Sequence, residues 1–163
     1  MSVPAIRAAV PGDLEAIGRL GALLVAEHHA FDAQRFIPAT PDTPRGYASY
    51  LGTQLGKEEV VILVAEAAGT VLGYAYAGME GWDYMALRGP AGAVYDLVVD
   101  PACRGQGIGR ALLERVLAEL AARGAPRMVL STAEQNTAAQ RLFARAGFRR
   151  TMIEMTRETG GSS

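Results

Sequence analysis

The stretch that most constrains this chain is a short apolar run that ends in a proline and is followed by three closely spaced glycines. Residues 93–99 read AVYDLVV, a composition rich in valine that is typical of a buried strand. Asp100 and Pro101 end this run, because proline cannot donate to a strand ladder and aspartate favours turns. Residues 104–109 read RGQGIG and open a helix that we expect to reach about Ala122. The sequence therefore predicts a strand, a glycine turn and a helix in direct succession.

The glycine turn has the chemistry of an anion-binding site. Its glycines lack the Cβ atoms that keep a ligand away from the backbone. The first N–H groups of the following helix have no intrahelical partner, and the helix dipole adds partial positive charge there. Arg104 and Arg110 add full positive charges at the same place. Together these features suit a diphosphate group.

Two common phosphate-binding patterns do not fit the turn. A P-loop would need Gly-Lys followed by Ser or Thr, and this stretch has no lysine. The dinucleotide fingerprint would place its third glycine at position 110, which is Arg110. A dinucleotide-dependent oxidoreductase is therefore disfavoured.

Composition and charge narrow the class of protein further. The chain has 163 residues, half of them apolar, and a formal net charge of −1. We expect one folded domain at residues 1–158 with a disordered tail at 159–163, and neither nucleic acid nor a membrane as partner. No signal-like segment or membrane-spanning run is present, and Cys103 is the only cysteine, which favours a cytoplasmic protein without disulfides. Cys103 is either a tolerated small residue or a reactive thiol.

The order of predicted elements favours a mixed sheet with helices on both faces, an α/β (α+β) protein. Asp13 is a plausible cap for the first helix, which we expect to end near His28. Residues 80–92 read as a long irregular segment that holds the only tryptophan. The predicted strands are residues 4–10, 60–66, 71–79, 93–99, 126–131 and 148–157, and the predicted helices are residues 13–28, 45–56, 108–122 and 138–146.

Two motifs resemble those of the GNAT superfamily of N-acetyltransferases. One is Arg-x-x-Gly-x-Gly at residues 104–109, preceded by Val-Asp-Pro. The other is residues 136–148, where Asn opens a helix, an aromatic residue follows Leu, and Gly-Phe ends the pattern. The resemblance covers about residues 60–155. It implies a GNAT-like, mostly antiparallel central sheet of six to seven strands flanked by about four helices, with acetyl-CoA in the opening where two strands splay.

The resemblance also implies roles for individual residues. The pantetheine arm would pair with the backbone of Leu97 and Val99, and the diphosphate would rest on the amides of residues 105–110. Phe143 stands where many relatives have a tyrosine that protonates the departing thiolate, and phenylalanine has no proton to give. The implied cofactor-binding residues are Leu97, Val98, Val99, Arg104, Gly105, Gln106, Gly107, Ile108, Gly109, Arg110, Asn136 and Phe143.

Acetyl transfer to an amine also needs a base, because an ammonium has no lone pair. Asp96 is the first candidate, since it lies on the central strand, and Glu80 is the second. Asp96 could instead be a buried carboxylate that only accepts hydrogen bonds, and an ordered water chain could then do the work. Strand alternation predicts that Tyr95 and Asp96 face opposite sides, so that at most one of them faces the substrate.

The expected activity is transfer of acetyl from acetyl-CoA to a primary amine, on a small molecule or a peptide N-terminus, by direct attack in a ternary complex. Carboxylates around the predicted opening favour a cationic amine. No metal is expected, because the only histidines are the adjacent His28 and His29. The alternative is an acyl-CoA-binding sensor without catalysis. The apolar end strand at residues 151–155 could pair across a homodimer. The expected substrate-binding residues are Glu27, Phe31, Trp82 and Tyr95.

Overall fold

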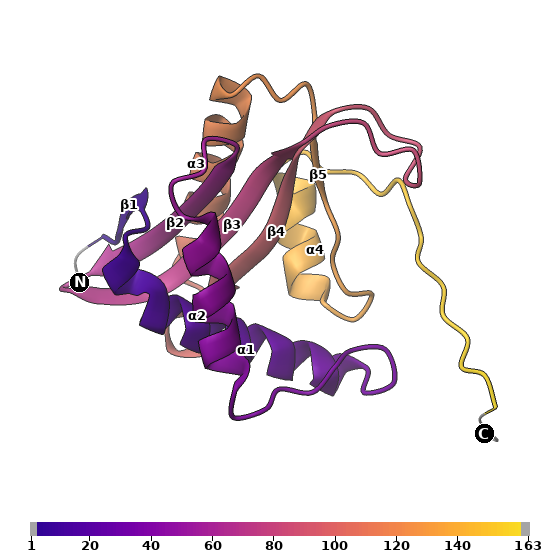
Figure 1. The fold of residues 1–163 in the computed structure, drawn as a ribbon, viewed down its shortest axis with the longest axis horizontal. Helices are drawn as coiled ribbons and strands as arrows, with labels where there is room; N and C mark the ends of the chain where they lie inside the picture. The colour runs from indigo at the N-terminus through magenta and orange to yellow at the C-terminus, as the bar shows by residue number, and fades with distance from the viewer. Residues whose placement is uncertain (1–2, 161–163) are drawn as a thin grey trace.

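The computed structural model describes residues 3–160, and a five-stranded sheet runs through its centre (Figure 1). The strands follow one another in space in the order of the chain. Neighbouring strands are antiparallel except for the last pair, which is parallel. The strands are β1 (Ala5–Ala8), β2 (Val60–Ala67), β3 (Thr70–Glu80), β4 (Ala91–Val99) and β5 (Met128–Leu130).

Four α-helices flank the sheet, and they are α1 (Leu14–Phe31), α2 (Thr43–Gln54), α3 (Ile108–Ala122) and α4 (Thr137–Arg145). In Figure 1, α1 and α2 lie in front of the sheet and α3 lies behind it. The apolar stripe of α3, with Leu112 and Val116, packs on alternate residues of β2 and β3 such as Ala75. Ile17 of α1 packs with Tyr74 on the other face. Side chains of β3 therefore alternate between two cores, as the strand period requires.

The predicted mixed, mostly antiparallel sheet is confirmed, but the number of strands is five and not six or seven. The expected strand at residues 148–157 does not form, and these residues have no regular secondary structure. A strand requires a neighbour, and here the chain leaves the sheet after α4 (Figure 1). Residues 161–163 of the expected tail lie outside the described residues.

Other boundaries also differ from the predictions. The segment at residues 80–92 is a hairpin connection, because β3 continues to Glu80 and β4 begins at Ala91. Asp83 and Arg88 close this connection with two backbone hydrogen bonds of 2.9 Å. Asp13 does precede α1, but its carboxylate accepts from the Val10 amide and from the Arg7 guanidinium rather than capping α1. None of the helices in residues 3–160 combines the length and hydrophobicity needed to span a bilayer.

Two glycines allow α1 and α2 to approach each other closely. A Cβ atom added at Gly18 would lie 2.3 Å from the Pro44 carbonyl oxygen, which is backbone and cannot rotate away. One added at Gly21 would lie 2.4 Å from the Tyr47 ring. The position of α2, and of the tyrosines that it carries, therefore depends on these small residues.

We expect Gly18→Ala to lower the free energy of unfolding by about 1–3 kcal/mol, because the added methyl overpacks a backbone contact. The matched control is Gly46→Ala in α2, where an added Cβ meets nothing within 4 Å. There the helix propensity of alanine should raise stability by about 0.5–1 kcal/mol. Urea denaturation followed by circular dichroism measures both changes, and equal stability of the two variants would show that the helix contact is loose.

Candidate active site

A β-bulge in β4 sets the geometry of the candidate site. Tyr76 of β3 pairs with Asp96, but the next residue, Ala77, pairs with Val94, so that Tyr95 has no partner. The extra residue breaks the alternation of the strand. As a result, Tyr95 and Asp96 both face the α1 and α2 side of the sheet. The prediction that they face opposite sides is wrong, because alternation holds only along an unbroken ladder.

Contacts of both side chains confirm this arrangement. The Tyr95 ring lies 4.9 Å from the Tyr76 ring, centroid to centroid. The Tyr74 hydroxyl donates a hydrogen bond of 2.9 Å to the Asp96 carboxylate. Tyr74 and Tyr76 belong to the core cluster that α1 covers. The bulge therefore adds a phenol and a carboxylate to a tyrosine-rich face.

Of these groups, Tyr76 and Asp96 line a pocket of about 360 Å³ between α2 and the sheet. Asp96 is the only charged residue among those that line it. The Tyr50 and Tyr76 hydroxyl oxygens lie 3.2 Å apart, and their rings meet edge to face. Aromatic walls and one carboxylate are suited to a cationic amine. The lining residues are Gly46, Tyr47, Tyr50, Leu51, Tyr76 and Asp96.

Burial makes Asp96 more basic than an exposed aspartate. Desolvation raises the pKa of Asp96 above its usual range, and the hydrogen bond from Tyr74 and the charge of His28 oppose the rise. A carboxylate with a raised pKa is a better proton acceptor near neutral pH. Burial also raises the pKa of Tyr74 and the pKa of Tyr76, so that both phenols stay protonated and can donate hydrogen bonds.

Glu80, the second predicted base, belongs to a network at the edge of this pocket. Its carboxylate accepts a 2.5 Å hydrogen bond from the Tyr95 hydroxyl and a 2.9 Å hydrogen bond from the Arg88 guanidinium. The hydrogen bond from Tyr95 has the largest effect and that from Arg88 the next, and both hold the pKa of Glu80 below its usual range. Glu80 is absent from the residues that line the pocket. Its geometry suits a group that fixes the Tyr95 ring.

A second pocket of about 200 Å³ adjoins the first and shares Tyr47 with it. His28 lines this pocket, and its Nδ1 lies 2.8 Å from the Leu24 carbonyl oxygen. That contact requires a proton on Nδ1. Phe31 packs edge to face on His28 at 5.5 Å. The predicted substrate residue Phe31 thus supports a pocket wall instead of forming one.

The other predicted substrate residues lie apart from the pocket. Glu27 forms a 2.7 Å ion pair with Arg104 and so joins α1 to the glycine turn. Trp82 is exposed near the tip of the β3–β4 hairpin and stacks on Tyr84 at 6.3 Å. Of the four predicted residues, Tyr95 contacts the wall of the first pocket through Tyr76, and Phe31 contacts the wall of the second through His28.

The glycine turn has the shape that an anion site requires. Gly105 and Gly107 adopt φ values of +79° and +81°, and added Cβ atoms would meet nothing within 4 Å. Gly107 caps α3, and the first intrahelical bond runs from the Ala111 amide to its carbonyl. The amides of residues 108–110 therefore have no intrahelical acceptor and are free to bind a ligand. The Arg110 side chain pairs with Glu114, so the backbone supplies most of the donors at the turn.

An open strand edge leads from the pocket to this turn. β5 pairs with β4 only at residues 92–94, so within the described part of the chain β4 has no strand partner on that side from Tyr95 to Val99. α4 flanks the opening, and a Cβ added at Gly109 would contact both Val99 and Leu142. The Asn136 side-chain oxygen accepts a 3.1 Å hydrogen bond from the Ala139 amide and so caps α4. The opening suits an extended ligand that ends in phosphates.

Two further residues from the sequence analysis, Phe143 and Cys103, pack against neighbouring side chains. Phe143 of α4 packs edge to face on Phe148 at 6.0 Å. Cys103 is half-buried against the α3 core. Among residues 3–160, no three His, Cys, Asp or Glu side chains gather as metal ligands.

On the sequence alone, Tyr74 and Tyr76 are candidates for an acid or a substrate contact but fit packing better, and Tyr47 and Tyr50 are expected on the inner side of a helix, so none of the four was assigned to the site. Tyr74 and Tyr76 are two residues apart on a strand and therefore share a face, and Tyr47 and Tyr50 are three apart on a helix. The spacing of each pair was visible in the sequence. That the two pairs face each other was not, because they come from different elements.

Known proteins show the same organisation. The profile of the Acetyltransferase (GNAT) family matches residues 24–148. Mycothiol acetyltransferase of Thermobispora bispora is 43% identical over 56% of this chain and 31% of its own length. Mycothiol acetyltransferase of Cellulomonas flavigena is 31% identical over 93% of this chain and 42% of its own length. The chain thus spans less than half the length of these curated relatives.

Solved structures agree on the fold. A GCN5-related N-acetyltransferase from Ralstonia eutropha has a TM-score of 0.72 and 27% identity, with 97% of this chain and 99% of that one covered. The aminoglycoside N-acetyltransferase AAC(6')-Iy, in complex with a bisubstrate analogue, has a TM-score of 0.74 and 21% identity, with 97% and 99% covered. With most of its length matched by the family profile, the chain belongs to the GNAT family of acetyltransferases.

Proposed function

We propose that this protein transfers the acetyl group of acetyl-CoA to a cationic primary amine that binds in the tyrosine-walled pocket. The observation that carries this proposal is the position of Asp96. It is the one charged residue lining the pocket, and it lies on the bulge where β4 loses its β5 neighbour. The relatives named mycothiol acetyltransferase, and the neighbour bound to a CoA–aminoglycoside analogue, support the same class of reaction.

The residues around the opening fit acetyl-CoA, which supplies the acetyl group as a thioester. Leu97, Val98 and Val99 would hold the pantetheine arm along the open edge of β4. The diphosphate would lie against the amides that follow Gly107, where the open space at both left-handed glycines leaves room for it. The full set that we assign to the cofactor is Leu97, Val98, Val99, Arg104, Gly105, Gln106, Gly107, Ile108, Gly109, Arg110, Asn136 and Phe143.

Asp96 would accept the proton of the bound ammonium and so free its lone pair for attack. Its raised pKa makes this transfer easier than for an exposed aspartate. Tyr76 and Tyr50 would orient the amine, because their rings and hydroxyls border the pocket. The bulge leaves backbone groups around Tyr95 without strand partners, and an N–H there can donate to the carbonyl oxygen as it gains charge.

No residue of the described site is a strong candidate for protonating the leaving thiolate. Phe143 has no acidic proton, and burial raises the pKa of Tyr76 and the pKa of Tyr95, which makes both poor acids. A thiol has a pKa of about 8.5, so its thiolate leaves without an acid catalyst. We therefore assign the reaction to direct attack in a ternary complex, with protonation of the thiolate by water.

The alternative function is an acyl-CoA-binding sensor without turnover, which the phenylalanine at position 143 keeps open. The experiment that separates the two is calorimetry with acetyl-CoA followed by a free-thiol release assay over a panel of primary amines. Turnover with any amine class supports the enzyme. Binding without turnover on all of them favours the sensor.

We expect Gly107→Glu to abolish acetyl-CoA binding, because a carboxylate would fill and repel at the diphosphate site. The matched control is Gly124→Glu at the other end of α3. Gly124 is also left-handed, with φ of +89°, and open to solvent. Both variants carry the same charge change and the same backbone strain, so calorimetry isolates the effect of position. Equal affinities would show that the turn does not bind the cofactor.

We expect Asp96→Asn to lower kcat by about 10²–10⁴-fold, because an amide cannot accept the proton. Acetyl-CoA affinity should not change, since the pocket lies apart from the turn. In the wild type, kcat/KM should rise with pH as Asp96 ionises. The variant should lose this rising part of the pH profile. Asp42→Asn, on an exposed carboxylate, is the control. Full activity of the Asp96 variant would assign the base to another group or to water.

We also expect Asp96→Asn to stabilise the fold at neutral pH. The folded pKa of Asp96 is raised, so its ionisation costs stability as pH rises through that pKa, and an asparagine avoids this cost. Below the unfolded pKa of aspartate, about 3.9, the wild-type side chain is protonated in both states and the difference should vanish. Thermal melts of the two proteins across pH measure this, and a constant difference would contradict it.

A further inference from the structure

The second pocket, of about 200 Å³, has walls that the chemistry at Asp96 does not use. Those walls come from α1, from the connection between α1 and α2, and from α2 itself. They are mostly apolar, and within residues 3–160 no carboxylate lines them. An apolar pocket of this kind holds the uncharged part of a small molecule. The lining residues are Leu24, Val25, His28, Phe36, Ile37 and Tyr47.

Tyr47 of α2 lines both pockets and forms the ridge between them. Its ring is fixed by close packing, because a Cβ atom added at Gly21 would lie 2.4 Å from it. Tyr47 also lies near Asp96, since burial and, after it, the charge of Asp96 raise the pKa of the Tyr47 phenol. A molecule whose ammonium lies beside Asp96 therefore reaches the second pocket by crossing one tyrosine ring.

The two adjacent histidines hold one wall of the second pocket in place. The His28 ring packs edge to face on the Phe36 ring at 5.1 Å. Nδ1 of His29 lies 2.8 Å from the Phe36 carbonyl oxygen, and the Arg35 guanidinium lies over the Phe36 ring at 4.8 Å. The wall is thus formed before any ligand binds, as is usual for small-molecule sites.

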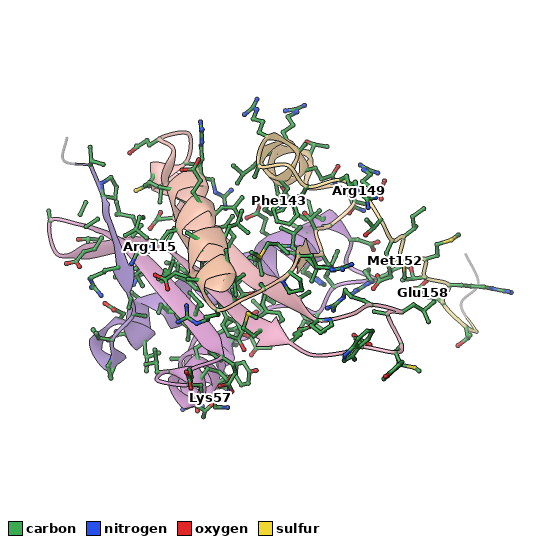
Figure 2. The ribbon with its side chains drawn as sticks, turned by 90° about the horizontal axis from the view of Figure 1, so that it is seen from above. Lys57, Arg115, Phe143, Arg149, Met152 and Glu158 are labelled. Carbon is green, nitrogen blue, oxygen red and sulfur yellow. The ribbon has the colours of Figure 1, made fainter. Side chains whose placement is uncertain are left out.

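The carboxylates around the α1–α2 connection already have partners. The Asp32 carboxylate accepts hydrogen bonds from two backbone amides. Figure 2 shows Glu158 far along the C-terminal segment, away from the packed elements. A second ammonium placed in the second pocket would therefore lose its hydration without gaining a counter-charge. The ion pairs in this region are Glu27 with Arg104, Glu154 with Arg35, and Asp42 with Arg45.

We propose that the acetyl acceptor has a single ammonium group and an apolar body, and that the second pocket holds this body while the ammonium lies at Asp96. This inference rests on the proposed function and narrows it, because diamines and polyamines are then poor acceptors. Leu24, Phe36 and Ile37 become the residues that determine specificity. They do not touch the reacting atoms, so they act on binding of the acceptor and not on proton transfer.

The first test compares hexylamine with cadaverine, a diamine with the same number of heavy atoms. Both offer one ammonium to Asp96, and they differ only at the far end, which is a methyl group in one and an ammonium in the other. Calorimetry in the presence of CoA, which cannot react, measures the dissociation constant of each. We expect hexylamine to bind about 10-fold more tightly or better, because the second ammonium of cadaverine is desolvated without compensation.

A carboxylate placed in the second pocket should reverse this preference. Leu24→Glu provides one, and it should raise KM for hexylamine and lower KM for cadaverine, with kcat nearly unchanged. The matched control is Leu23→Glu, at the preceding position of α1, which is 38% exposed and does not line the pocket. It should keep the wild-type preference. Ile37→Glu offers a carboxylate from the opposite wall at a position that is 74% exposed, and it replaces Leu24→Glu if that variant does not fold.

The two histidines report where the apolar body lies. His28 lines the second pocket, whereas its neighbour His29 does not, and the chain has no other histidine. In the complex with CoA, phenethylamine should shift the imidazole proton signal of His28 through the ring current of its phenyl group. The signal of His29 should change little. Ethylamine, which lacks the ring, should bind about 10–100-fold more weakly and shift His28 much less.

Cadaverine that binds the wild type as tightly as hexylamine would overturn the inference. So would a His28 signal that phenethylamine leaves in place, or a preference that both Leu24→Glu and Ile37→Glu leave unchanged. None of the binding measurements needs acetyl transfer. Binding with the expected preference, but without thiol release from acetyl-CoA, would therefore support the pocket assignment and contradict the proposed enzyme.

Discussion

The pairing register between β3 and β4 is the constraint on which the site depends. Because Tyr95 is unpaired, the side chains of Val94 and Asp96 on either side of it face opposite sides of the sheet. Val94 points into the core under α3, whereas Asp96 points to the tyrosines under α1 and α2. Without the bulge, Asp96 would enter the α3 core, where no described group offers it a hydrogen bond. The position of a single residue in the ladder therefore places the carboxylate in the pocket.

The pocket couples function to a local loss of stability. Asp96 is half-buried among aromatic side chains, and within residues 3–160 Tyr74 is the one side chain that donates a hydrogen bond to it. Burying a carboxylate with a single hydrogen bond disfavours its charged form, which raises its pKa. The same penalty that weakens the fold makes the group a better proton acceptor.

The sheet is complete on one side of β4 and incomplete on the other, and the proposed cofactor site follows from that asymmetry. Toward β3 the ladder is long and anchors both cores. Toward β5 only three residues pair, which opens the edge that we assign to the cofactor.

Local features were predictable from the sequence because they are decided by neighbouring residues. The strand at residues 93–99, the glycine turn and the start of α3 follow from residue type, and so does the capping of α4 by Asn136. The family followed from two such motifs. These elements need no distant partner to specify them.

The tertiary structure alone decided the features that join distant residues. Alternation along β4 could not reveal an extra residue in its ladder, because a bulge depends on the register with β3. Glu27 and Arg104, which the sequence assigned to substrate and cofactor, pair with each other across the fold. The tyrosines of α2 and β3 lie close together only because α1 holds α2 over the sheet. Residues 148–157 have the pattern of a strand, yet a strand forms only where an edge is within reach.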